Sequence, residues 1–341
     1  MLGNTALQLP ARSEAILRQL PLLTLYLTER CNSRCVSCDY WRSGSHDIDL
    51  QQVSRLLPQL QTLGTRLVVL SGGEPLLHPE WAAIASILRR HGLKVWLLTA
   101  GLALAKHAER AATLFDVITV SLDGTNAQTY AAIRGVDAFA HVCRGIRAAV
   151  AKHVRVTLRV TLQRANYREL DQFVALAHEL AVSEISFLTV DVANPHAFAR
   201  MQRQCSDLAL SVEDLPILER LITDLECNRA ADFSSGFIAQ SPNKLRRMLQ
   251  YFAAVQGRAA YPRVKCNAPE FSAVMDAHGQ LQPCFFIPGP QRRPGTALTE
   301  TLNSDAMIEL RSRIHNGNRP ECLTCVCSLH REPGEFERDL Q

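Results

Sequence analysis

The stretch LLTLYLTERCNSRCVSCDYW (residues 22–41) joins a mainly apolar run to three closely spaced cysteines. Its first part, Leu22–Leu27, is typical of a strand in a parallel sheet that is covered on both faces. Functional loops of parallel α/β folds follow the carboxyl ends of such strands. The three cysteines therefore stand where we expect an active-site loop.

Apolar runs followed by amphipathic stretches recur from residue 22 to residue 190. Further strands are expected at Leu67–Leu70, Lys94–Thr99, Val117–Ser121, Val154–Leu162 and Glu184–Val190. Helices are expected at Gln51–Leu63, Glu80–His91, Ala103–Leu114, Phe139–Lys152 and Tyr167–Leu180. Six strand–helix units in succession predict an α/β fold, namely a partial (β/α)6 parallel barrel.

The pattern changes after Val190. Two helices are expected, at Val212–Leu225 and Lys244–Val255, and Ser211 with Asp214 resembles a capping box before the first. From Tyr261 the chain is rich in Pro, Gly and Cys, with strand candidates at Ser272–Asp276 and Gln280–Pro283 around the turn sequence DAHG (276–279). This tail is too small for a large core of its own, so we expect it to need a staple, which a metal can supply.

We therefore divide the chain into four parts. Residues 1–20 are an N-terminal extension, 21–195 the barrel core, 196–260 a helical connecting segment and 261–335 a small Cys-rich C-terminal domain stapled by metal.

Composition excludes several classes of protein. The 341 residues are 47% hydrophobic and 21% charged with a net charge of +4, as in an ordinary globular protein without an electrostatic case for nucleic acid or lipid. Aromatic residues make up 6%, which disfavours base-stacking surfaces. No apolar run approaches the roughly 20 residues of a membrane-spanning helix, and no secretory signal is evident. We expect a cytoplasmic protein that binds neither nucleic acid nor membrane.

The 11 cysteines are the unusual feature of the composition. An odd total without a signal peptide argues against a disulfide framework, and the dense local clusters suit metal ligation. Cys31, Cys35 and Cys38 can hold three irons of a 4Fe–4S cube and leave the fourth open, as a catalytic site requires. A zinc knuckle or three unrelated buried cysteines are the alternatives. Cys143, Cys205 and Cys227 stand alone and are interpreted as packing or surface residues.

The spacing Cys31-x3-Cys35-x2-Cys38 resembles the signature of the radical S-adenosylmethionine (SAM) superfamily. The resemblance implies that the open iron chelates SAM and that an electron from the cluster cleaves SAM to a 5′-deoxyadenosyl radical, which abstracts hydrogen from a substrate. The family often has an aromatic residue before the third cysteine. Here that residue is Ser37, and Tyr40 is the candidate for the aromatic role.

Three further motifs support the resemblance. LSGGEP (70–75) is similar to the GGEP motif, whose backbone receives the SAM ammonium group, and it implicates Gly72, Gly73 and Glu74. VSLDG (120–124) resembles a motif whose Ser and Asp, here Ser121 and Asp123, face SAM. In IRG (133–135), Arg134 is a candidate partner of the SAM carboxylate, and a surface arginine is the alternative. Considered apart from the cysteine triplet, each of these motifs is also typical of a turn or a helix cap.

The tail contains Cys266-x12-Gly279-x4-Cys284 and Cys322-x2-Cys325-x-Cys327. The first half resembles the start of a SPASM domain. The total of five tail cysteines resembles the shortened "twitch" form of that domain, which implies one auxiliary 4Fe–4S cluster. We assign Cys266, Cys284, Cys322 and Cys325 as its ligands, with Cys327 as the rival for the last place. Zinc is the alternative metal.

The sequence thus predicts a radical SAM enzyme whose auxiliary cluster accepts the electron left after hydrogen abstraction, relays electrons or is purely structural. Peptide maturases often carry an N-terminal peptide-recognition domain, and the roughly 20 residues before the first strand are too few for one. A small polar substrate such as a sugar or aminocyclitol is therefore favoured. The alternatives are a maturase of a ribosomally made peptide and a zinc-stapled binding protein without catalysis. An external one-electron reductant such as flavodoxin or ferredoxin is expected. His46, His78 and Asp191 are candidate bases, although a structural role is favoured for each.

Overall fold

The computed structural model describes residues 16–194, 196–200, 205–293, 295–327 and 329–332. In this part of the chain an eight-stranded sheet has the order β6-β5-β4-β3-β2-β1-β7-β8. The strands are β1 (Leu22–Thr28), β2 (Leu67–Gly72), β3 (Lys94–Thr99), β4 (Val117–Ser121), β5 (Arg155–Leu162), β6 (Glu184–Thr189), β7 (Ser272–Met275) and β8 (Leu281–Gln282). Strands β1 to β6 are parallel in chain order, which confirms the predicted partial barrel.

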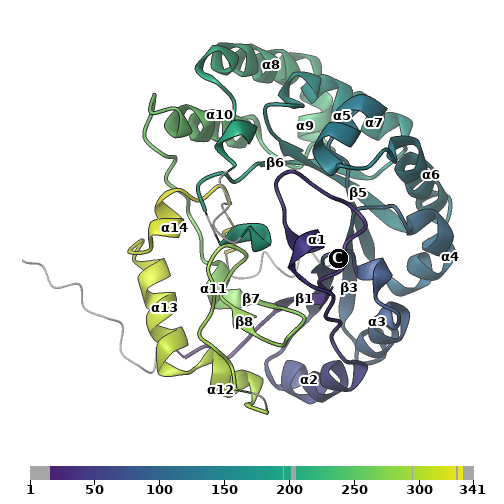
Figure 1. Cartoon of the computed structure of the whole chain (residues 1–341), viewed down its shortest axis with the longest axis vertical. Helices are drawn as coiled ribbons and strands as arrows, with labels where there is room; N and C mark the ends of the chain where they lie inside the picture. Colours follow the sequence, from purple (N-terminus) through teal and green to yellow (C-terminus); the bar gives the residue numbers. More distant parts are fainter. Residues whose placement is uncertain (1–15, 195, 201–204, 294, 328, 333–341) are drawn as a thin grey trace, which may run out of the picture.

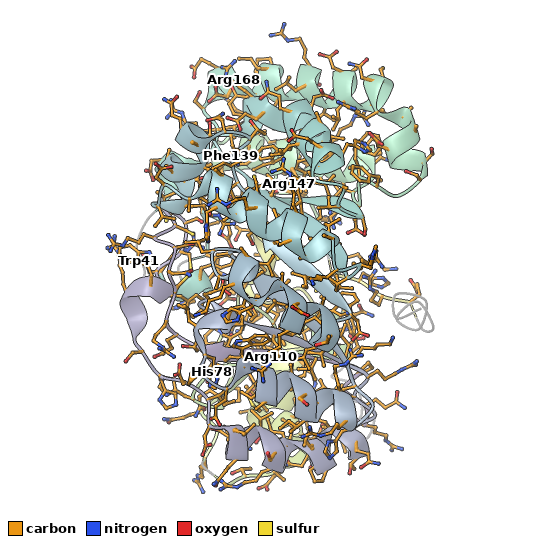
Figure 2. All side chains as sticks on the ribbon, turned by 90° about the vertical axis from the view of Figure 1, so that its right-hand side faces the viewer. Trp41, His78, Arg110, Phe139, Arg147 and Arg168 are labelled. Carbon is orange, nitrogen blue, oxygen red and sulfur yellow. The ribbon has the colours of Figure 1, made fainter. Side chains whose placement is uncertain are left out.

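Helices cover one face of this sheet and form the outer arc of the molecule (Figure 1). They are α2 (Leu50–Thr62), α3 (Trp81–Arg90), α4 (Leu104–Leu114), α6 (Phe139–Val150) and α7 (Leu170–Glu179). Side chains such as Arg110 on α4 and Arg147 on α6 lie on this helical layer (Figure 2). The main core lies between the helices and the strands, where alternate strand residues such as Val120, Leu158 and Phe187 are fully buried.

The opposite face of the sheet is more polar. Thr119 on β4 and Thr157 on β5 are paired in register, and their hydroxyl groups are 2.9 Å apart. Two residues further on, Ser121 and Arg159 form the next pair on the same face. Leu188 on β6 keeps 38% of its surface exposed. Hence a partly polar inner face runs toward the carboxyl ends of the strands, where a ligand site is expected.

The tail joins the same sheet. Strand β7 pairs with β1 in parallel and with β8 in antiparallel orientation, so the first strand of the barrel lies between β2 and a strand from the tail. The sequence predicted the β7–β8 hairpin but not its attachment to β1. The proposed domain boundaries remain a prediction.

The remaining helices connect and close the fold. The predicted capping box of Ser211 and Asp214 is present ahead of α8. Helix α8 (Leu215–Asn228) packs beside α10 (Pro242–Val255), and both were predicted. The α-helices without a predicted range are α1 (Tyr40–Ser43), α5 (Ala127–Arg134), α9 (Ala230–Ser234), α11 (Ala268–Phe271), α12 (Leu298–Leu302), α13 (Asp305–His315) and α14 (Pro320–Leu323). Within the described ranges, no helix has both the length and the apolar character needed to cross a bilayer.

Candidate active site

The loop after β1 brings Cys31, Cys35 and Cys38 close enough for their thiols to interact electrostatically. Burial raises the pKa of Cys31 and of Cys38 to about 12, and the charge of Cys35 adds to both shifts. Thiolates are therefore unfavourable here unless a positive group compensates them, as a metal does. In the described part of the chain, no three His, Cys, Asp or Glu side chains converge on a single-ion site. The cysteine ligands of a 4Fe–4S cube need not converge on a single point, because each thiolate binds a different iron atom.

The cysteine loop is fastened to the end of α5. The backbone N–H of Arg34 donates to the carbonyl of Arg134 over 2.8 Å, and the N–H of Val36 donates to the carbonyl of Ile133 over 3.0 Å. Gly135 allows this approach, since it has φ +68° and a Cβ there would lie 2.4 Å from the carbonyl oxygen of Arg34. The IRG motif therefore supports the loop through its backbone.

Arg134 connects two of the predicted motifs. Its Nε lies 2.9 Å from Oδ2 of Asp123, and its Nη1 lies 3.6 Å from Sγ of Cys35. Both charged side chains are buried, so the alternative of a surface arginine is wrong. Burial raises the pKa of Asp123, while Arg134 and the N–H of Thr161 oppose the shift. One fixed positive charge thus faces both a carboxylate and a cysteine of the triplet.

The GGEP segment is built around the buried carboxylate of Glu74. This carboxylate accepts hydrogen bonds from the N–H of Leu76 at 3.1 Å, the hydroxyl of Thr99 at 2.8 Å and the N–H of Ala100 at 2.7 Å. Its acceptor capacity is therefore engaged by the protein. The contribution of Ala100 was missed, because a backbone amide has no signature in the sequence.

Gly73 brings this segment against the chain that leads to Cys31. A Cβ at Gly73 would lie 2.2 Å from the carbonyl oxygen of Arg30, and that oxygen accepts the N–H of Glu74 over 2.8 Å. Gly72 ends β2 beside Thr28 of β1. The glycine pair and the cysteine loop are consequently adjacent, as the motifs predicted.

Tyr40 packs its ring edge-on against Tyr26 of β1, with centroids 5.6 Å apart. Burial raises the pKa of Tyr40, and the charge of Cys38 raises it further. The neighbouring Trp41 projects from α1 at the margin of the molecule (Figure 2). Tyr40 therefore closes the cysteine loop onto β1.

The three candidate bases all have structural partners. Both ring nitrogens of His78 are engaged, by the carbonyl of Ile48 at 2.8 Å and the N–H of Glu80 at 3.0 Å. His46 stacks on His278 with ring centroids 4.2 Å apart. Asp191 accepts two backbone N–H groups and lies 3.6 Å from Arg200. His78 and Asp191 are therefore engaged in structural hydrogen bonds, whereas His46 is an exposed residue held by ring stacking.

The five cysteines of the tail form a second group. Their thiols interact electrostatically with one another, although they come from three segments of the chain: Cys266, Cys284, Cys322, Cys325 and Cys327. Burial raises the pKa of Cys284 to about 12 and that of Cys322 to about 11. The thiol of Cys325 also contacts the backbone N–H and carbonyl of Cys327 at 3.3 Å. Of the lone cysteines, Cys143 and Cys205 are buried and Cys227 is exposed.

Part of this chain is similar in sequence to known proteins. The model of the radical SAM superfamily matches residues 25–177. GTP 3',8-cyclase of Klebsiella pneumoniae (strain 342) is 32% identical over 174 residues, which are 48% of this chain and 53% of the cyclase. Fe-coproporphyrin III synthase of Methanosarcina barkeri is 22% identical over 329 residues, which are 89% of this chain and 80% of the synthase. The chain thus spans about half the length of the first relative and most of the second.

Solved structures share the fold. Streptococcus suis SuiB bound to the precursor peptide SuiA has a TM-score of 0.67 and 14% identity, and the match covers 93% of this chain and 73% of SuiB. At this identity the likeness concerns the fold alone.

Proposed function

This chain belongs to the radical SAM superfamily through residues 25–177, and we propose that it is an enzyme that abstracts hydrogen from an organic substrate. The observation that carries the proposal is the position of Arg134, which faces both Cys35 of the triplet and Asp123 of a second motif. A structural zinc knuckle needs no such link between the cysteine loop and the end of β4.

The thiols of Cys31, Cys35 and Cys38 fit a 4Fe–4S cluster with one open iron. Three soft ligands lie on one loop, and the buried guanidinium of Arg134 offsets part of the negative charge of their thiolate forms. When bound, the cluster supplies the electron that cleaves SAM to a 5′-deoxyadenosyl radical. The surrounding protein excludes water and holds the loop in place.

Residues around the cluster are assigned to SAM. The backbone carbonyls of Gly72 and Gly73 accept hydrogen bonds from the ammonium group of SAM. The Glu74 carboxylate keeps this turn rigid through its hydrogen bonds to Leu76 and Ala100. Ser121 and Asp123 face the ribose or the methionyl part from the end of β4. Arg134 supplies the charge for the SAM carboxylate.

The tail is assigned an auxiliary 4Fe–4S cluster. Cys266, Cys284, Cys322 and Cys325 are its ligands, and Cys327 is the fifth thiol of the group. A closed site suits an electron acceptor or a staple, because no position is left for substrate. With this cluster as acceptor, the net reaction is an oxidation of a small polar molecule; a ribosomal peptide is the alternative substrate. An external reductant such as flavodoxin or ferredoxin supplies the first electron.

The test compares anaerobically reconstituted variants. The intact protein should be brown and form 5′-deoxyadenosine from SAM and a reductant. Replacing Cys31, Cys35 and Cys38 by Ala should abolish 5′-deoxyadenosine but leave iron in the tail, whereas Cys143→Ala, a buried control outside both groups, should retain the activity. A colourless, zinc-containing protein would favour a stapled binding protein instead.

A further inference from the structure

The loop of the cysteine triplet has a buried inner side and an exposed outer side. On the inner side, Sγ of Cys35 lies 3.6 Å from Nη1 of the buried Arg134. A turn leads from Cys35 to Cys38, whose N–H donates to the carbonyl of Cys35 over 3.3 Å. Arg34 and Arg42 flank this turn on the outer side, and both are exposed. Their side chains have no role in the chemistry described above.

Trp41 connects the outer side to the triplet. Its indole N–H donates to the carbonyl of Cys38 over 3.0 Å, and the guanidinium carbon of Arg42 lies 4.2 Å from the centre of its ring. Trp41 is only partly buried, and it projects from α1 at the margin of the molecule (Figure 2). An aromatic ring at the surface is therefore one hydrogen bond away from a residue that is assigned to the cluster.

The charges of this loop are arranged with the cations outward. The side chain of Asp39 is 10% exposed and lies 3.6 Å from that of Arg42, which is 59% exposed. Arg34 is exposed, and no ion pair joins it to any residue that the structure describes. The loop surface, defined as Arg34, Trp41 and Arg42, therefore presents positive charge around an aromatic ring.

Other charged residues adjoin the loop surface. Arg30 pairs with Asp47 over 2.6 Å, and Glu29 contacts the ring of His278 over 3.0 Å. Asp137, which follows α5 on the segment that fastens the cysteine loop, is an exposed acid. A partner that approaches the loop surface would therefore meet this one charge of opposite sign beside the two cations.

We propose that Arg34, Trp41 and Arg42 form the docking surface of the external electron donor, an acidic flavoprotein of the flavodoxin type. Two exposed cations attract an acidic partner, and Trp and Arg are among the residues that contribute most to binding at protein interfaces. The exposed indole favours a donor whose redox group is itself a flat aromatic ring, because two such rings can stack.

The step at this surface is the transfer of one electron from the reduced flavin of the donor to the cluster of the triplet. The flavin is oxidised by one electron, the cluster is reduced by one electron, and no bond forms or breaks. The inference rests on the proposed function in assigning a redox cluster to the triplet.

The experiment measures, by stopped flow near 400 nm, the rate at which a reduced acidic flavodoxin reduces the reconstituted protein without SAM. We expect Arg34→Gln/Arg42→Gln to lower the second-order rate constant by about 10-fold and to weaken its dependence on ionic strength. Trp41→Leu should lower the rate constant as well, whereas Asp137→Asn should raise it by about 2-fold. Dithionite should still reduce each variant completely, with the wild-type iron content and potential.

Arg90→Gln is the matched control. Arg90 is exposed at the end of α3, which leads into the beginning of β3, so it lies at the opposite end of the sheet and should keep the wild-type rate. Arg247, which lines a hollow together with Cys325, tests entry of electrons through the tail. The proposal is overturned if Arg247→Gln slows reduction while the loop variants do not. It is also overturned if Arg90→Gln slows reduction as much as they do, or if they slow an acidic ferredoxin but not the flavodoxin.

These outcomes are separate from those of the proposed function. A protein that flavodoxin reduces through the loop surface, but that forms no 5′-deoxyadenosine from SAM, would refute the enzymatic proposal and leave the docking surface standing. Formation of 5′-deoxyadenosine with dithionite, together with equal flavodoxin rates in the wild type and in Arg34→Gln/Arg42→Gln, would refute the docking surface alone.

Discussion

Replacing Arg134 by Met tests whether the buried ion pair with Asp123 holds the site together. The pair is 2.9 Å long, and its side chains are 9% and 7% exposed. At that separation the attraction is about 6 kcal/mol for an effective dielectric constant near 20. Removing one partner of a buried pair costs about 3–5 kcal/mol, since the other charge is left without compensation. We expect that loss of unfolding free energy for Arg134→Met.

The effect is measured by urea unfolding of the metal-free chain. The unfolding transitions followed by circular dichroism and by tryptophan fluorescence should coincide, as a two-state transition requires. The double variant Arg134→Met/Asp123→Asn should recover about 2 kcal/mol of the loss, because a neutral amide needs no counter-charge and its oxygen still accepts the N–H of Thr161. A loss below about 0.5 kcal/mol, the value for a surface position, together with additive effects in the double variant, would refute the reasoning.

Three further variants test other contacts. Gly73→Ala places a Cβ 2.2 Å from the Arg30 carbonyl oxygen and should lower the unfolding free energy by about 1–3 kcal/mol in the same urea assay. Cys284→Ser should halve the bound iron and lower the thermal midpoint, whereas Cys143→Ser keeps the iron in full; unchanged iron in Cys284→Ser would contradict its assignment. Although burial raises the pKa of Asp47, hydrogen bonds including that from Arg30 hold it below its ordinary 3.8. As the pH falls, the Asp47 carboxylate of the unfolded chain takes up a proton at a higher pH than that of the folded chain. Stability therefore falls as the pH drops below about 4, and Asp47→Asn should flatten that fall in a pH series of urea midpoints.

The strands of the barrel were predictable because their signal is local. Lys94–Thr99 and Val117–Ser121 have the predicted bounds, since short runs of branched apolar residues end at polar turns. Helix α5 (Ala127–Arg134) was missed for a physical reason: one of its buried residues is Arg134, whose charge hides the apolar period. The pairing of β7 with β1 was also missed, because a strand of four residues carries no information about its neighbour.

The site was predictable only in part. Cysteine spacing locates the triplet, since its ligands lie in one loop. The bond between Glu74 and the backbone of Ala100 spans 26 positions and leaves no mark in the sequence. Arg159 did leave one: together with Arg155, Thr157 and Thr161 it occupies the alternate polar positions of RVTLRVTL (155–162). Strand alternation could therefore have identified a polar inner face with a cation on it.

The segment after β6 joins the two groups of thiols mechanically. Its Phe198 carbonyl accepts the N–H of Asp39, next to Cys38, over 2.9 Å. Its Asn194 amide donates to the carbonyl of Phe286, near Cys284, over 2.9 Å.

Between these two anchors the segment is stiffened by Arg200, a fully buried side chain that donates to the carbonyls of Asp191, Asn194 and Ala197. A loop whose carbonyls are fixed from within cannot lengthen when one end moves. The tail hairpin and the loop of the cysteine triplet are therefore both hydrogen bonded to this one segment. The segment that contacts both groups of thiols is therefore held in one conformation from within by this buried arginine.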